Sequence, residues 1–292
     1  MFVVFSHILA FATLFVGSVF DLKTTEVPDS VSVAGIVGGV LLHAAASFTG
    51  PADISVLGDL SLLFSQPLTW FSALGDPLLW SLGVGIVFSV YGWALYFSGM
   101  WGGADAFAMG VLGFGAPYAV TGPGLVHVAD LFVNILLVGF VYTLGFAVYR
   151  AFLEGGVFQE TLRRLKEDRR RVVAEGSVAA AVSFFGSYTG RFNGPLYFVL
   201  LASMIVLYRF LLVVQENSLS TEVDVSELEG GEVVESEDLD SKVKGITEEE
   251  VESLEGSVTV KEGVRFVPAF PVALLLTELT GIGVRWLVVL VS

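Results

Sequence analysis

The feature that most limits the fold of this chain is a series of apolar runs, several of which approach 20 residues in length. A helix of about 20 apolar residues, rising about 1.5 Å per residue, crosses the roughly 30 Å hydrocarbon core of a bilayer. The 292-residue chain is 54% apolar and only 15% charged, with a mean hydropathy of +0.77. A soluble domain of this size needs more polar surface than that. We therefore expect a polytopic membrane protein whose partner is the lipid bilayer.

The apolar runs predict an all-α fold, a helical bundle of about eight transmembrane helices. The expected spans are residues 2–20, 31–48, 77–99, 104–120, 129–150, 172–190, 195–214 and 268–290. The sixth is the weakest, because Glu175, Gly176 and Gly186 interrupt it, and it could instead lie along the membrane surface. The expected number of spans is therefore six to eight.

The predicted organisation has five parts, ending in a transmembrane helix that follows a small acidic soluble segment. They are a membrane domain (1–150), a basic loop (151–171), a helical hairpin (172–215), the acidic segment (216–266) and a C-terminal transmembrane helix (267–292). Residues 216–265 hold 16 acidic and 4 basic residues. Within this segment the pattern predicts a helix at 247–254 and strands at 258–261 and 264–267.

The charge distribution predicts how the chain is oriented in the cell membrane. Residues 150–171 are strongly basic, and basic loops face the cytoplasm. Counting five crossings back from this loop puts the N-terminus outside, and it puts Asp21 and the turn at 100–105 inside. The side of the acidic segment depends on whether 172–190 crosses.

The residue inventory excludes several classes of chemistry. The chain has no cysteine, so it has no disulfide, thiol nucleophile or cysteine metal site. His7, His43 and His127 are far apart in sequence and form no His-x-x-x-His pair, which argues against a membrane zinc peptidase. We expect no metal, cofactor or nucleic-acid partner, and we interpret the histidines as polar groups packed between helices.

Two aspartates stand out by their predicted position. Asp21 ends the first span and Asp105 begins the fourth, so the topology places both at one depth on the cytoplasmic side. Two carboxyl groups held close together cannot both ionise cheaply, so one keeps its proton while the other can act as a general base on water. The alternative is that both aspartates are simple helix caps at the membrane boundary.

Three segments resemble the type IV prepilin peptidases and the archaeal preflagellin peptidases. The run from Asp21 to Asp29, with Lys23 two places after the aspartate and Pro28-Asp29 at its end, looks like the first-aspartate motif of that family. Gly102-Gly103-Ala104-Asp105 looks like its Gly-x-Gly-Asp motif, with alanine in place of the second glycine. Residues 263–271, with Pro268 and Pro271, are similar to the proline-rich start of the last span in archaeal members.

The resemblance implies that Asp21 and Asp105 are the catalytic pair of an intramembrane aspartic endopeptidase. Its substrates would be prepilin-like or prearchaellin-like proteins, whose leader peptides would be cleaved at the cytoplasmic face. The bacterial branch often adds N-methylation through a cysteine-bearing insert that this chain lacks, so we expect peptidase activity alone.

Several other residues are expected to support the site formed by Asp21 and Asp105. Lys23 could bias the charge of Asp21 or anchor the loop to lipid phosphate, and Pro28 and Asp29 would shape the turn, with Asp29 as the N-cap of the next helix. Gly102, Gly103 and Ala104 would let a substrate backbone come close to Asp105. Glu278, near the middle of the last span, is a secondary candidate because an acid there is costly.

Two functions of other classes remain open at this point. A transporter or proton or cation pathway could use the intramembrane acids, although the sequence contains no internal repeat. A noncatalytic scaffold could display the acidic segment. The presenilin-like peptidases are a related alternative, because Pro271-Val272-Ala273-Leu274 distantly resembles their proline-alanine-leucine element.

Overall fold

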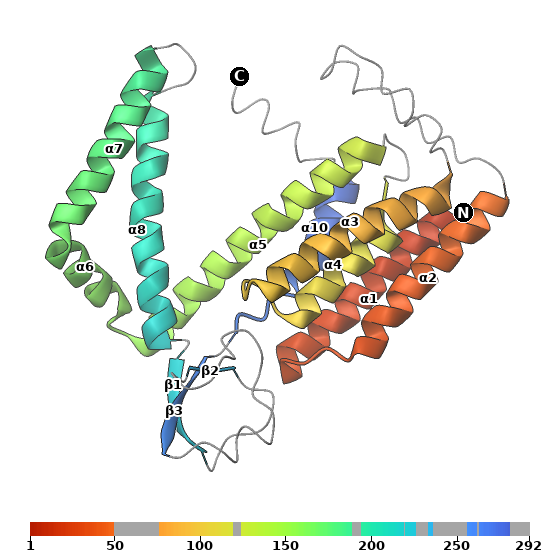
Figure 1. Ribbon diagram of the computed structural model, residues 1–292, viewed down its shortest axis with the longest axis horizontal. Coiled ribbons are helices and arrows are strands. Elements are labelled where there is room, and N and C mark those ends of the chain that lie inside the picture. Colours follow the sequence, from red (N-terminus) through yellow and green to blue (C-terminus); the bar gives the residue numbers. More distant parts are fainter. Residues whose placement is uncertain are drawn as a thin grey trace. The chain divides into compact units, whose positions relative to one another are not determined.

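The computed structural model describes residues 1–49, 76–118, 124–188, 194–218, 220–225, 233–235, 256–261 and 263–280 (Figure 1). It divides into two compact units, which are residues 1–143 with 264–288 and residues 144–263 with 289–292. The helices in these ranges are α1 (Phe2–Thr24), α2 (Asp29–Phe48), α3 (Pro77–Phe97), α4 (Gly103–Gly115), α5 (Gly124–Glu154), α6 (Val157–Glu167), α7 (Arg169–Tyr188), α8 (Gly194–Ser218) and α10 (Ala269–Thr280).

Five helices of the described ranges are long and apolar enough to cross a membrane, namely α1, α2, α3, α5 and α8. The protein is therefore mainly helical with several candidate membrane spans, as the sequence predicts, but the five found in the described ranges are fewer than the eight expected. Helix α4, with 13 residues, rises only about 20 Å, short of the roughly 30 Å hydrocarbon core. Of the last expected span, 268–290, the structure describes α10 as far as Thr280, and the remainder lies outside the described residues. Helix α7 is long enough, but the arginines at its start and Glu175 make it too polar.

The first unit is built around α4, which packs against α1, α2, α3 and α10 (Figure 1). Nine of its 13 residues are buried, so its apolar surface faces protein. Small residues let the neighbouring backbones approach closely. A Cβ atom added to Gly113 would lie 2.8 Å from the Cα of Gly85, and one added to Gly39 would lie 3.0 Å from the Cα of Gly115.

Helix α4 ends inside the bundle, where its last carbonyl groups need donors from other helices. The hydroxyl of Ser81 donates to the carbonyl of Phe114 at 2.7 Å, and the hydroxyl of Ser6 donates to that of Gly115 at 2.7 Å. On α2, the Nε2 of His43 lies 3.4 Å from the same Gly115 oxygen. These contacts fit the interpretation of His43 as a polar group packed between helices.

The N-terminus of α3 is held by a side-chain cap next to the end of α2. The carboxylate of Asp76 accepts from the backbone N–H groups of Leu78 and Leu79 at 2.8 and 3.2 Å, and from the Ser47 hydroxyl at 2.7 Å. These donors stabilise the charged form, so they hold the pKa of Asp76 below its usual value. The cap therefore joins α2 to α3 on the side opposite the turn at 100–105.

In the second unit, α7 and α8 lie side by side, and α6 packs on α8 (Figure 1). Valines and a phenylalanine of α8 (Phe210, Val213 and Val214) pack with Val157 of α6. Arg209 of α8 pairs with Asp168 at 2.9 Å and with Glu175 at 3.2 Å. On α6, Arg163 and Arg164 hydrogen-bond to Glu160 and lower its pKa to about 2.

The described part of the acidic segment forms a three-stranded antiparallel sheet in the order β1-β3-β2. Its strands are β1 (Ser220–Asp224), β2 (Val233–Glu235) and β3 (Ser257–Lys261). The strand expected at 258–261 is confirmed. The strand expected at 264–267 is wrong, because residues 264–266 have no regular secondary structure and 267–268 form a turn before α10. The helix expected at 247–254 lies outside the described residues.

Candidate active site

Asp21 lies in the last turn of α1 with its side chain directed into the first unit. The helix ends at Thr25, whose left-handed backbone (φ 62°) lets its N–H donate back to the carbonyl of Asp21. Only 6% of Asp21 is exposed. Its Oδ2 accepts a hydrogen bond of 3.2 Å from the backbone N–H of Val267, at the turn before α10. Residues 246 positions apart are thus joined at this carboxyl group.

Asp105 lies in the first turn of α4 and is equally buried, with 7% of its surface exposed. Gly102 is the N-cap of the helix, and its N–H donates to Oδ2 of Asp105 at 3.1 Å. Within the described ranges the other oxygen, Oδ1, is buried and has no hydrogen-bond partner. A buried acceptor without a donor is costly, and such groups are commonly kept for function.

The two carboxyl groups belong to one cluster. They are near enough for the charge of Asp21 to act on Asp105, although 84 positions separate them in sequence. Trp101, which precedes the α4 N-cap, packs against Phe266 and Phe270 with ring centroids 5.7 Å apart in both cases. These aromatic contacts connect the turn before α4 to the turn before α10. They therefore hold Gly102 and Val267, whose N–H groups donate to Asp105 and Asp21, near each other.

Arg265 brings a positive charge to the cluster. Its Nη1 donates to the carbonyl of Leu22, and the guanidinium is close enough to Asp21 for the two charges to interact. Neither Arg265 nor Val267 was predicted from the sequence as a site residue. Both lie in the 263–271 segment, whose resemblance to the start of the last span was the available signal.

The other residues expected to support this site have the following places. Lys23 is exposed in the last turn of α1. Pro28 is the N-cap position of α2 and Asp29 its first residue, so the expectation that Asp29 is the N-cap is wrong by one position. Pro268 immediately precedes α10, and Pro271 lies in its first turn, where a missing N–H costs no helical hydrogen bond.

The small residues before Asp105 leave space around the backbone. A Cβ atom added to Gly103 would come no nearer than 3.8 Å to another residue, the Tyr96 ring, and one added to Gly102 would meet only Oδ2 of Asp105, at 3.4 Å. Ala104 is half-buried. Contacts within the protein therefore do not require glycine at 102 or 103.

Glu278 does not belong to this cluster. It lies on the last described turns of α10, beside His7 and His127, at the end of the first unit where α4 terminates. The sequence does not predict that these three residues meet.

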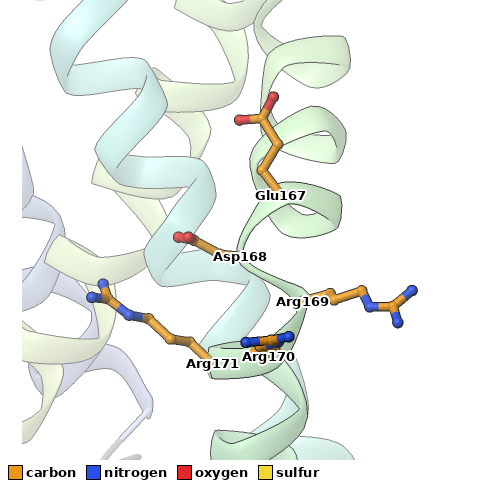
Figure 2. Close-up of a pocket in the computed structure, with 5 residues that line it drawn as sticks. All are labelled: Glu167, Asp168, Arg169, Arg170 and Arg171. Carbon is orange, nitrogen blue, oxygen red and sulfur yellow. The ribbon is translucent and has the colours of Figure 1, made fainter.

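A surface depression in the second unit is formed by Glu167 and Asp168 at the end of α6 and by Arg169, Arg170 and Arg171 at the start of α7. Figure 2 shows Asp168 directed toward α8, where Arg209 pairs with it, while Arg169 and Arg171 point in opposite directions. These side chains do not converge on one point, so the aspartate cluster of the first unit is the stronger candidate site.

Comparison with known proteins identifies no relative of this chain. The chain matches no protein-family model, no curated protein and no solved structure.

Proposed function

We propose that the protein is an intramembrane aspartic endopeptidase that removes leader peptides from prepilin-like or prearchaellin-like proteins. The observation that carries this proposal is the pair of buried, electrostatically interacting carboxyl groups of Asp21 and Asp105. The family resemblance of the surrounding motifs supplies the substrate class. The membrane-spanning helices and the cytoplasmic position of the site belong to the same proposal.

The cluster has the groups that aspartic hydrolysis needs. Of two adjacent carboxyls, one is protonated and the other is charged, and the charged one takes a proton from a water molecule held between them. The oxygen of that water forms a bond to the carbonyl carbon of the substrate. The protonated carboxyl donates its proton to the carbonyl oxygen. Collapse of the tetrahedral intermediate then breaks the C–N bond. The carboxyl that took the proton from water gives it to the leaving amine, and a hydroxyl of the intermediate returns a proton to the other carboxylate.

Three features of the site favour the two carboxyls in these roles. The unbonded Oδ1 of Asp105 is available for a water or a substrate oxygen. The Val267 N–H and the charge of Arg265 offset part of the cost of burying Asp21. The space beside Gly102 and Gly103 would admit an extended peptide next to Asp105.

The proposal is tested by co-expressing the chain with prepilin and prearchaellin precursors. We expect a leader-dependent mobility shift of the precursor, with mass spectrometry locating the cut before its hydrophobic segment. A precursor whose leader has been deleted serves as the control and should not shift. Precursors that stay full-length in membranes containing the folded protein would contradict the proposed function.

A further inference from the structure

Three ionisable side chains meet at the end of the first unit where α4 terminates. His7 of α1 and His127 of α5 each direct Nε2 toward Oε1 of Glu278 on α10, at distances of 3.3 and 3.5 Å. All three atoms lie within 4.8 Å of one another. The two histidines are buried, and Glu278 is half-buried. The cluster thus joins three helices that are distant in sequence.

The hydrogen bonding of His7 leaves its Nε2 facing the cluster. Nδ1 of His7 lies 2.8 Å from the carbonyl oxygen of Val3, which can only accept, so Nδ1 carries a hydrogen and donates it. A neutral imidazole with a donating Nδ1 has its lone pair on Nε2. Metal-binding histidines are typically oriented in this way, with the second nitrogen donating to a backbone carbonyl.

The atoms that converge on the cluster are all electron-rich. Besides the two Nε2 atoms and the carboxylate, the carbonyl oxygen of Tyr118 lies 2.9 Å from Nε2 of His7, and that of Ala116 lies 3.2 Å from Nε2 of His127. Lone pairs repel one another unless a positive group lies among them. The group must therefore be a proton on each nitrogen or a bound cation.

The surroundings of Glu278 distinguish protons on the nitrogens from a bound cation. A hydrogen on each Nε2 would be directed at the two carbonyl oxygens. In the part of the chain that the structure describes, Oε1 of Glu278 is buried and lies 3.3 and 3.5 Å from the two Nε2 atoms, but neither contact has the geometry of a hydrogen bond. An unsatisfied buried carboxylate oxygen is costly, whereas a cation would contact this oxygen and both nitrogens at once.

We infer that His7, His127 and Glu278 bind a divalent transition-metal ion of the Zn²⁺ class. Ligands about 2.0–2.2 Å from a tetrahedral zinc ion lie about 3.3–3.6 Å from one another, and both nitrogen–oxygen distances fall in this range. A backbone carbonyl or a water molecule would complete the coordination. The inference departs from the expectation, drawn from sequence spacing, that the chain holds no metal.

The metal would have a structural role, clamping α1, α5 and α10 together. Asp105 and Ala116 lie at opposite ends of α4, roughly 16 Å apart along its axis at about 1.5 Å per residue, so the ion would be remote from the proposed catalytic pair. The inference therefore does not depend on the proposed peptidase function.

The test measures zinc bound to the purified full-length protein after chelator treatment and reloading with ZnCl₂. We expect one zinc ion per chain and a higher melting temperature with zinc than without it. His127→Ala and Glu278→Gln should each lose stoichiometric binding and the thermal shift. His43→Gln is the matched control, since His43 is a buried histidine outside the three ligands, and this variant should retain both.

A spectroscopic measurement on the wild-type protein keeps the inference testable if the variants do not fold. Cobalt-substituted protein should show the absorption of a four- or five-coordinate site, and zinc X-ray absorption should show imidazole scattering. A wild-type protein that binds no zinc, a site without imidazole ligands, or unchanged binding in both ligand variants would overturn the inference. A zinc-free protein whose histidine NMR signals show a doubly protonated His7 would indicate that protons hold the cluster instead.

Discussion

Asp21→Asn and Asp105→Asn are each expected to reduce leader-peptide cleavage by at least about 10³-fold, while the protein still reaches the membrane. Asparagine keeps the shape of the side chain but can neither accept a proton from water nor donate one as a carboxylic acid does. The fold should tolerate both changes. In Asp21→Asn the amide oxygen can still accept the hydrogen bond from the Val267 N–H, and in Asp105→Asn it can accept the one from Gly102.

The matched control for these variants is Glu26→Gln. Glu26 is an exposed acid five positions from Asp21, and it has no contact that the proposed chemistry uses. This variant should cleave at the wild-type rate. Cleavage should be followed by mass spectrometry at equal amounts of membrane-inserted enzyme. Near wild-type cleavage by either asparagine variant would remove that aspartate from the catalytic pair.

The second large effect is expected on stability. Gly113→Ala should lower the free energy of unfolding by about 1–3 kcal/mol, because the interface between α3 and α4 has no space for a methyl group. The new Cβ would lie 2.8 Å from the Cα of Gly85, 2.8 Å from the Cβ of Phe88 and 2.9 Å from the carbonyl oxygen of Val84. None of these atoms is the end of a flexible side chain, so α4 itself must shift, and Asp105 with it.

The control for this effect is Gly83→Ala on the exposed face of α3. A Cβ at position 83 meets no atom within 4 Å, so the substitution should be neutral or stabilise the helix by up to about 1 kcal/mol. Both variants should be compared with the wild type by thermal or SDS-induced unfolding in the same detergent. Equal stability of the two variants would show that α3 and α4 do not pack as closely as described.

The sequence predicts the helices of this protein better than it predicts their surroundings. Long apolar runs correctly indicate α1, α2, α3, α5 and α8, because in these helices an apolar residue faces either lipid or a neighbouring helix. Helix α4 is apolar for another reason, since protein covers it on several sides. Hydropathy alone does not distinguish the two environments, and this is why α4 was counted as a full-length span.

The candidate site, too, was predictable from the sequence only in part. Local motifs were enough to identify Asp21 and Asp105 as a possible pair and to place the start of α10 close to Pro268. They could not identify Arg265, whose charge matters only because the turn before α10 folds against the end of α1. The meeting of His7, His127 and Glu278 likewise depends on three helices packing together, which sequence spacing does not reveal.

The central claim, that the two aspartates meet in one site, can be measured directly because the natural chain contains no cysteine. In the double variant Asp21→Cys/Asp105→Cys, a short bismaleimide should link α1 to α4 in membranes. The crosslink would be detected on a gel after proteolysis between residues 21 and 105, because the two fragments would stay joined. The pair Asp21→Cys/Phe114→Cys, with its second thiol at the far end of α4, should remain unlinked. If the first pair stays unlinked although both thiols react with a single maleimide, the two aspartates do not form one site and the proposed chemistry is wrong.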